Sequence, residues 1–129
     1  MADPQKQIQA IGDEYQKLQT ELAEIVQARE KLESQQQENK SVQKEFTSLE
    51  DDANIYKLVG PVLLKQEKKD AMMAVEGRLD FIEKEISRIE KQIADIQDQS
   101  EKKKVEIIQL QTAMQQQQQQ QAAAGAATA

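Results

Sequence analysis

The sequence contains no cysteine, no histidine and no tryptophan, and each absence excludes a class of function. Without cysteine there is neither a disulfide framework nor a thiolate site. Without histidine the chain lacks the usual metal ligand and the usual general base near neutral pH. No glycine-rich loop is present that would hold a phosphate. We therefore expect no catalytic residue, no cofactor and no metal, and we do not expect an enzyme.

Long apolar runs and basic arms are missing as well. No stretch approaches the roughly 18 consecutive apolar residues of a membrane span, and the start, MADPQKQIQA, lacks the apolar region of a secretory signal. The net charge of −6 disfavours non-specific binding to nucleic acid. These features predict a soluble, cytoplasmic protein that binds neither membranes nor nucleic acid.

What the sequence has instead is the composition of long helices. Aromatic residues make up only 3% of the chain and charged residues 31%, so a compact globule would lack bulky side chains for its core. Glu, Lys, Gln, Ala, Leu and Ile dominate, as in coiled coils. We therefore expect a mainly α protein with extended helices.

Residues 1–50 carry apolar side chains at alternating steps of three and four, which predicts a coiled-coil helix. The first seam positions are Ile8, Ile11, Tyr15, Leu18, Leu22, Ile25 and Leu32. Arg29 is the polar member of this seam. The apolar pattern resumes at Val42, Phe46 and Leu49, but only after a shortened step from residue 32 to residue 35. This step predicts a stammer, a three-residue irregularity that overwinds the coiled coil. Gln35 and Asn39 lie in the polar stretch between Leu32 and Val42. A buried Asn39 would fix the register of the helices; the alternative is that this stretch is frayed or hydrated.

Residues 71–114 form a second arm with stricter heptads. Its seam positions are Met72, Val75, Leu79, Ile82, Ile86, Ile89, Ile93, Ile96, Ile107, Leu110 and Met114, with Ser100 and Lys103 replacing apolar residues. Gly77 lies off the seam and has no evident role. Because the two arms match in length and are joined at their inner ends, an antiparallel helical hairpin is the economical arrangement, although a parallel dimer would satisfy the same seams. The expected facing pairs are Leu49 with Met72, Leu32 with Ile89, Ile25 with Ile96, and Ile11 with Leu110.

The free ends of the two arms carry more apolar side chains than a two-helix seam uses. They are Ile8, Ile11, Tyr15, Ile107, Ile108, Leu110 and Met114. Two interpretations stay open: a frayed end, or a tip that offers apolar grooves to another chain. Beyond it, residues 115–129 are a Gln run followed by AAAGAATA, a low-complexity tail. We expect this tail to leave the helix within a turn or two and to be disordered.

Residues 51–70 separate the arms and predict a β-hairpin. The cluster Glu50–Asn54 favours a turn, and the β-prone segments 55–59 and 62–66 flank Gly60-Pro61. A glycine followed by proline suits a type II′ turn, which pairs Val59 with Val62, Leu58 with Leu63, Lys57 with Leu64, and Tyr56 with Lys65. Asp70 is expected to cap the second helix.

Such a hairpin is marginal in water on its own, carries apolar residues on both faces, and has two open edges. Hairpins from several subunits would remove these edges by closing a barrel. The alternative, a floppy apolar loop, would expose an aggregation-prone run. We therefore predict a long antiparallel two-helix coiled coil whose central hairpin completes an intersubunit β-barrel. The predicted assembly residues are Ile55, Tyr56, Leu58, Val59, Gly60, Pro61, Val62, Leu63 and Leu64.

The stretch YKLVGPVLLKQEKKDA, residues 56–71, followed by RLDFIEKEI, residues 78–86, resembles β-type prefoldin subunits. The likeness extends from about residue 5 to residue 114. It implies a heterohexamer of two α-type and four β-type subunits, in which β-type subunits carry one hairpin and α-type subunits carry two. It further implies an ATP-independent chaperone that captures unfolded or nascent chains such as actin and tubulin at its coiled-coil tips, and delivers them to the cytosolic chaperonin.

Carried onto this sequence, the client-binding tip of that family corresponds to Ile8, Ile11, Tyr15, Ile107, Leu110 and Met114. The alternative function is a structural or tethering coiled coil without client binding. The hairpin discriminates between the two, because a tether has no need of strands that neighbouring subunits must complete.

Overall fold

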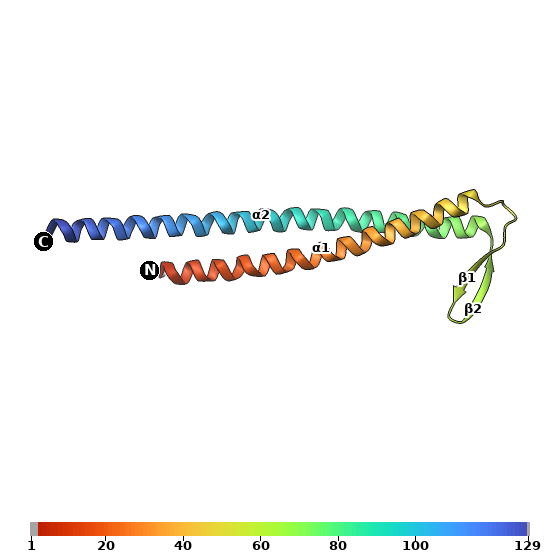
Figure 1. Ribbon diagram of the computed structural model, residues 1–129, viewed down its shortest axis with the longest axis horizontal. Helices are drawn as coiled ribbons and strands as arrows, with labels where there is room; N and C mark the ends of the chain where they lie inside the picture. The colour runs from red at the N-terminus through yellow and green to blue at the C-terminus, as the bar shows by residue number, and fades with distance from the viewer. Residues whose placement is uncertain (1–2, 129) are drawn as a thin grey trace. The chain divides into compact units, whose positions relative to one another are not determined.

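The computed structural model describes residues 3–128, and Figure 1 shows the order of the elements. Helix α1 spans Pro4–Ser48, strands β1 and β2 span Ile55–Val59 and Val62–Gln66, and helix α2 spans Lys68–Thr128. The strands form an antiparallel two-stranded sheet. The expected mainly α fold with one central hairpin is confirmed.

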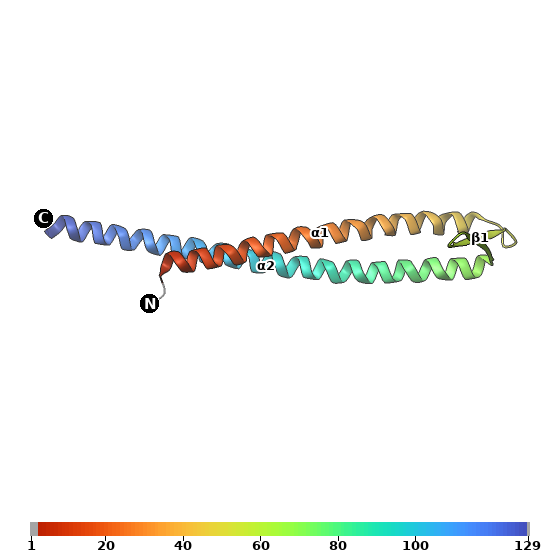
Figure 2. The same ribbon diagram turned by 90° about the horizontal axis from the view of Figure 1, so that it is seen from below.

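The contacts divide the chain into two units, each containing a segment of both helices. The first unit comprises Met1–Val26 and Gln92–Ala129, and the second unit comprises Gln27–Lys91 with the hairpin. In the first unit Glu14 pairs with Lys103, and in the second unit Arg29 pairs with Glu90. Within each unit the two helical segments therefore run antiparallel (Figures 1 and 2). The chain satisfies its seam by itself, as a helical hairpin and not as a parallel dimer.

Helix α1 begins where its sequence supplies both signals of a helix start. The Asp3 carboxylate accepts a hydrogen bond from the Gln5 amide at 3.1 Å, and the Asp3 carbonyl accepts one from the Gln7 amide at 3.0 Å. Pro4 occupies the first helical position, where its missing N–H costs nothing. Asp3 is thus the N-cap residue, and it satisfies amides that would otherwise lack partners.

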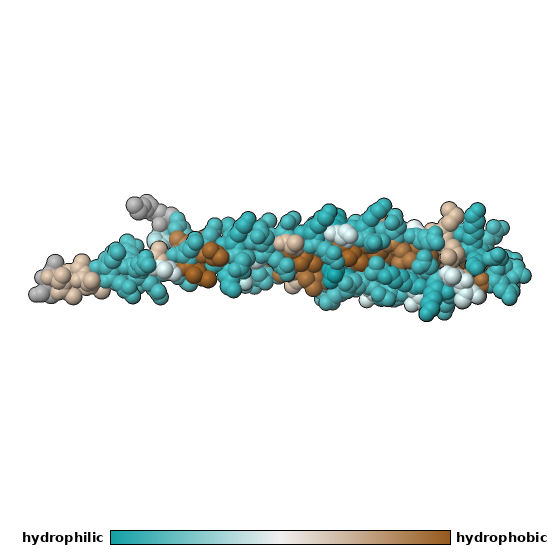
Figure 3. All heavy atoms as spheres, turned by 90° about the horizontal axis from the view of Figure 1, so that it is seen from above, coloured by the Kyte–Doolittle hydropathy of each residue, from teal (hydrophilic) through white to brown (hydrophobic). Residues whose placement is uncertain are grey.

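The seam of α2 follows the predicted heptads. Ala71, Val75, Ile82 and Ile89 are buried in the second unit, and Ile96 is buried in the first. Ser100 occupies the next seam position with 6% of its surface exposed, which confirms that a polar residue interrupts the apolar seam there. Figure 3 shows, on the face in view, hydrophobic side chains along the middle with hydrophilic residues on either side.

The stammer predicted in α1 is wrong, because the heptad continues without a break. The seam positions that are at least partly buried are Ile8, Ile11, Tyr15, Leu18, Leu22, Ile25, Arg29, Leu32, Gln36, Asn39, Gln43 and Phe46. Val42 and Leu49, which suggested the irregularity, are each 39% exposed beside this seam. Polar residues therefore occupy true seam positions. The Asn39 side-chain amide donates to the Gln35 backbone carbonyl, one turn earlier on the same helix, at 2.7 Å.

The two cross-helix ion pairs agree with the expected register to within about a helical turn. The expected pairs would place residue 92 opposite Arg29 and residue 107 opposite Glu14, and the ion pairs join these two residues to Glu90 and Lys103. Long charged side chains reach along the seam, so an ion pair locates the register only to about that precision. Ile11 and Leu110, one of the expected facing pairs, line the same groove.

Both ends of α2 also differ from expectation. The helix starts at Lys68, so Asp70 lies in its first turn and does not cap it. A carboxylate there still interacts favourably with the positive end of the helix. At the other end the helix continues through the Gln run to Thr128, where we had expected a disordered tail. Gln and Ala are both good helix formers, which explains the continuation. Ala129 lies outside the described residues.

We predict that Gln36→Leu stabilises the helix pair by about 1 kcal/mol, since it places a leucine at a partly buried seam position. Gln35→Leu is the matched control, because Gln35 is exposed whereas the adjacent Gln36 is partly buried. Thermal unfolding followed by far-UV circular dichroism measures the difference. An equal or larger gain in stability for Gln35→Leu would instead support the stammer, which places residue 35 in the seam.

Candidate functional site

The hairpin forms in the register predicted from the sequence. Val59 pairs with Val62 and Leu58 with Leu63, and the ladder continues to Ile55 opposite Gln66. Gly60 has a φ of +57°, and no other described residue has positive φ. A positive φ at the first turn position followed by proline is the pattern of a type II′ turn, whose twist matches that of the strands. Gly60 and Pro61 therefore determine the geometry of this surface.

The apolar side chains of the hairpin are exposed. Leu58 is 68% exposed and Leu63, directly opposite, is 62% exposed. The other exposed large side chains of the hairpin are Tyr56, Val59, Val62 and Leu64. Because neighbouring residues on a strand point to opposite faces, Leu58 and Leu63 share one face while Val59, Val62 and Leu64 share the other. Both faces of the ribbon are therefore apolar and uncovered.

The strand edges are open as well. Within residues 3–128, β1 and β2 pair only with each other. Each strand therefore presents a row of backbone N–H and C=O groups that could pair with a further strand. Figure 1 shows the hairpin projecting from the helix pair of the second unit and not lying against it. The helices cannot serve as the missing cover.

Two contacts hold the base of the hairpin. Ile55, the first residue of β1, is buried at 7% exposure, which marks where the ribbon joins the body of the second unit. The Lys68 ammonium donates to the Leu49 carbonyl at 2.6 Å and lies 3.5 Å from the Asp51 carboxylate. Lys68 thereby satisfies a carbonyl at the end of α1 from the first residue of α2. The hairpin is thus tied at its root and uncovered along its length.

The predicted tip residues lie together in the first unit, but they are only partly exposed. All six occupy seam positions between the two helical segments and are partly buried: Ile8, Ile11, Tyr15, Ile107, Leu110 and Met114. A shallow groove runs beside them, lined by Gln7, Ala10, Ile11, Glu106, Gln109 and Leu110. Ile11 and Leu110 are the two candidates that reach this groove. Its remaining lining is small or polar.

Two apolar residues missing from the predicted tip set are more exposed than its members. Ile108 is 51% and Val105 43% exposed, both on the outer side of α2 in the first unit. Ile108 follows the seam residue Ile107, so its helical position points it away from the partner helix. The signal in the sequence that could have identified both as surface residues is that neither occupies a seam position of the heptad.

A cross-helix ion pair fixes the first unit beside the polar seam positions. The Lys103 ammonium donates to the Glu14 carboxylate at 2.7 Å, and this hydrogen bond raises the pKa of Lys103 above its ordinary value. Since the folded-state pKa is raised, the pair contributes stability below the ordinary lysine pKa and loses it as the pH rises through the higher folded value. The interaction is therefore present throughout the physiological pH range. Near it, the buried Ser100 hydroxyl makes no hydrogen bond within the described chain.

The described residues contain neither a metal site nor a membrane span. Among residues 3–128, no group of acidic side chains is arranged to hold a metal ion. Neither described helix has a stretch apolar and long enough to cross a membrane. The exposed hairpin and the groove of the first unit are the two surfaces to which the predicted site residues contribute.

Comparison with known proteins identifies the family. Residues 9–121 match the family described as "Prefoldin subunit". Prefoldin subunit 6 of Saccharomyces cerevisiae is 52% identical over 100 residues, covering 78% of this chain and 88% of that protein. Prefoldin subunit 6 of Homo sapiens is 41% identical over 111 residues, covering 86% of each. The chain belongs to the prefoldin subunit family of chaperones, as the stretch around Gly60-Pro61 suggested.

A solved structure supports the same assignment. The prefoldin beta subunit from Thermococcus strain KS-1 matches with a TM-score of 0.77 at 26% identity, covering 83% of this chain and 94% of that one. The beta2 subunit from the same strain matches with a TM-score of 0.62 at 25% identity, covering 70% and 97%. The expected resemblance to β-type subunits is confirmed.

We predict that Gly60→Ala weakens assembly with partner prefoldin subunits, because a Cβ at this positive φ costs about 1–2 kcal/mol. Co-expression with partner subunits, followed by size-exclusion chromatography, measures the fraction assembled. Gly12→Ala is the matched control: Gly12 lies inside α1 and an added Cβ would meet nothing within 4 Å. That change should leave assembly intact and strengthen the helix. Equal assembly of the two variants would contradict a required turn geometry.

Proposed function

We propose that this chain is a β-type subunit of a hexameric prefoldin-type chaperone, assembled from two α-type and four β-type subunits. In this proposal the hairpins of the subunits pair into a double β-barrel, and the helical tips capture unfolded or nascent polypeptides without ATP. The complex then delivers them to the cytosolic chaperonin. The single observation that carries the proposal is the hairpin with two apolar faces and two open edges.

The energetics of the hairpin favour assembly over isolation. Burying a large apolar side chain contributes about 1.5–3 kcal/mol, and Leu58 and Leu63 alone leave most of their surface exposed. A strand from a neighbour would also complete the unpaired backbone groups at an edge. Barrel closure satisfies both requirements at once. The presence of one hairpin among the described residues supports the β-type over the α-type, for which the family resemblance implies two.

The tips suit many weak contacts and not one tight pocket. The groove beside Ile11 and Leu110 is shallow, with three polar residues, Gln7, Glu106 and Gln109, in its lining. Ile108 adds a separate exposed side chain. One such tip would hold an unfolded chain weakly. Several tips on one body raise the effective concentration of binding groups, so that the complex retains a client that each tip alone would release.

Weak contacts of this kind also explain release. Each contact can break without nucleotide hydrolysis, so a receiving chaperonin can compete for the client one tip at a time. Actin and tubulin are the clients that the family resemblance implies, and the cytoplasm is the compartment in which they fold. We propose both for this chain.

A tethering coiled coil is the competing function, and the hairpin argues against it. A tether needs only the seam, which the two helices complete within one chain. It would gain nothing from a projecting apolar ribbon, which is an aggregation hazard unless covered. No described feature of the chain favours tethering over assembly.

We predict that Leu58→Asp combined with Leu63→Asp abolishes entry into the complex. The two carboxylates would face each other across the ladder and would be buried unpaired in a closed barrel. Native mass spectrometry of the chain co-expressed with partner subunits measures incorporation. Helicity should change little, because neither side chain packs on a helix.

The matched control is Val105→Asp combined with Ile108→Asp, which adds the same charge at exposed positions in the first unit. This control should enter the complex normally. A normal-sized complex containing the Leu58/Leu63 variant would contradict the barrel.

We also predict that deleting residues 1–15 and 107–129 spares assembly and weakens the suppression of client aggregation several-fold. The deletion removes all six predicted tip residues and leaves the hairpin intact. Light scattering of chemically unfolded actin in the presence of the assembled complex measures the effect. Deleting residues 115–129 alone is the control and should change suppression little. Undiminished suppression by the larger deletion would favour a merely frayed end.

A further inference from the structure

Among the described residues outside the hairpin, the two most exposed large hydrophobic side chains lie on one helix of the second unit. Phe81 is 63% and Met73 60% exposed on α2. They are eight residues apart, which places them about 80° apart around the helix, both on the side away from the buried seam at Val75 and Ile82. The seam of this chain uses neither side chain.

Gly77 lies midway between them, one turn from each, and the chain itself gives no reason for a glycine there. Its φ is not positive, and a Cβ added to it would meet nothing within 4 Å. Glycine weakens a helix interior relative to alanine. What distinguishes Gly77 from the other helical glycines is its position between two exposed large hydrophobic side chains. A glycine at such a place permits the close approach of another backbone or side chain.

The surface is hollowed at this point. A groove in the second unit is lined by Gln35, Asn39, Ala74, Gly77, Arg78, Phe81 and Ile82. Its floor is open because Ala74 and Gly77 are small, and Phe81 forms one apolar wall. The polar seam residue Asn39 contributes the opposite side from α1.

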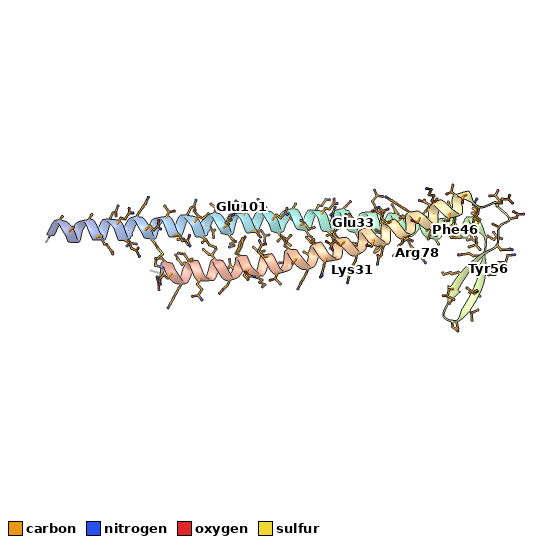
Figure 4. All side chains as sticks on the ribbon, in the orientation of Figure 1. Lys31, Glu33, Phe46, Tyr56, Arg78 and Glu101 are labelled. Carbon is orange, nitrogen blue, oxygen red and sulfur yellow. The ribbon has the colours of Figure 1, made fainter. Side chains whose placement is uncertain are left out.

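The groove is also lined by a positively charged side chain, that of Arg78. Arg78 makes no ion pair among the residues of the described chain, whereas Arg29, Lys84 and Arg88 all do. Figure 4 shows Arg78 on α2 at the end of the second unit that bears the hairpin with Tyr56. A guanidinium beside an aromatic ring and a small-residue floor suits an apolar side chain accompanied by a carboxylate.

We propose that this surface, which we call the Phe81 groove, receives a neighbouring subunit of the same complex. The inference rests on the proposed hairpin assembly and extends it to the helix. The groove lies in the same unit as the hairpin, and α2 starts two residues after β2 ends. At about 1.5 Å per residue, Met73 lies roughly 8 Å and Phe81 roughly 20 Å along α2 from its start. A neighbour whose strand pairs with the hairpin would therefore lie within reach of this part of α2.

The proposal thus gives the assembly a second contact, made by an apolar side chain and an acidic residue of the neighbour. The hairpin surface is apolar and barrel-forming, and is suited to any sister subunit. The Phe81 groove adds an aromatic, a close-approach position and a charge. These features can distinguish one neighbour from another.

The test measures how well variant and wild-type chains compete for incorporation into the complex. Full-length wild-type chain and a mass-distinguishable variant are co-expressed in equal amounts with the partner subunits, and native mass spectrometry measures the share of each. Met73→Gln combined with Phe81→Gln should reduce the variant's share at least tenfold. Glutamine keeps the helix and adds no charge that Arg78 could pair with. The matched control is Val105→Gln combined with Ile108→Gln, which removes two other exposed apolar residues, 43% and 51% exposed, from the first unit and should compete equally with wild type.

Two further variants test the close approach and the charge. Gly77→Gln should raise the helicity of the full-length chain by circular dichroism, yet lower its share of the complex. Arg78→Glu should lower its share through repulsion of the neighbour's carboxylate. An unchanged share for Arg78→Glu would overturn the acidic requirement.

The outcomes separate this inference from the proposed function. If the Met73/Phe81 variant competes equally while the Leu58/Leu63 variant is excluded, the groove proposal is wrong and hairpin assembly stands. If the Met73/Phe81 variant competes equally but the resulting complex captures less client, the groove binds clients and the proposal of a subunit contact is also wrong. If the Leu58/Leu63 variant enters the complex too, hairpin assembly itself fails.

Discussion

A two-stranded ribbon with apolar side chains on both faces cannot be satisfied by the chain that contains it. Two helices provide one narrow seam, and that seam is fully used between the helices themselves. The hairpin is left with exposed leucines at Leu58 and Leu63 and with backbone groups that lack partners at both edges. This constraint makes the chain a subunit. Its other features, including the tied root at Lys68 and the groove at Phe81, are informative because they lie on either side of that incomplete sheet.

The coiled coil is built for defined pairing more than for maximal stability. Gln36, Asn39 and Gln43 occupy seam positions in α1, and Ser100 and Lys103 do so in α2. Polar seam residues cost stability but disfavour registers in which they would face apolar partners. The Arg29–Glu90 and Glu14–Lys103 pairs, at 2.9 and 2.7 Å, reinforce this in the two units separately. A subunit made of two long helices needs such polar residues, because purely apolar heptads allow the helices to pair in more than one register.

The hairpin was predictable to the residue, and the seam of α1 was not. Around Gly60-Pro61 only one turn type fits and only one register follows, so the strand bounds and pairs came directly from local chemistry. In α1, counting apolar residues selected Val42 and Leu49, which lie beside the seam, over Gln36 and Gln43, which lie in it. Partner packing overrode side-chain polarity there. The start of α2 was misplaced because Asp70 is a good cap in isolation, whereas the backbone had already become helical at Lys68.

The exposed residues of the candidate surfaces show the same limit. Heptad spacing separates Ile107 from Ile108, yet it does not say how much of an off-seam side chain a neighbour on the other helix will cover. The sequence places Phe81 and Met73 off the seam, but the groove beside Phe81 also needs Gln35 and Asn39 of the other helix. Such surfaces arise from several residues on two elements, and a linear pattern shows only one element at a time.

The position of the hairpin in the middle of the chain also dictates an order of events during synthesis. Contacts near it join residues close in sequence, whereas Arg29 and Glu90 are 61 residues apart and the tip contacts are more distant still. Closing a longer loop costs more entropy, so pairing progresses from the turn outward and the tips meet last. Until α2 leaves the ribosome, the apolar seam of α1 has no partner. A newly made copy of this protein therefore exposes an apolar helix face until its second helix has been synthesised.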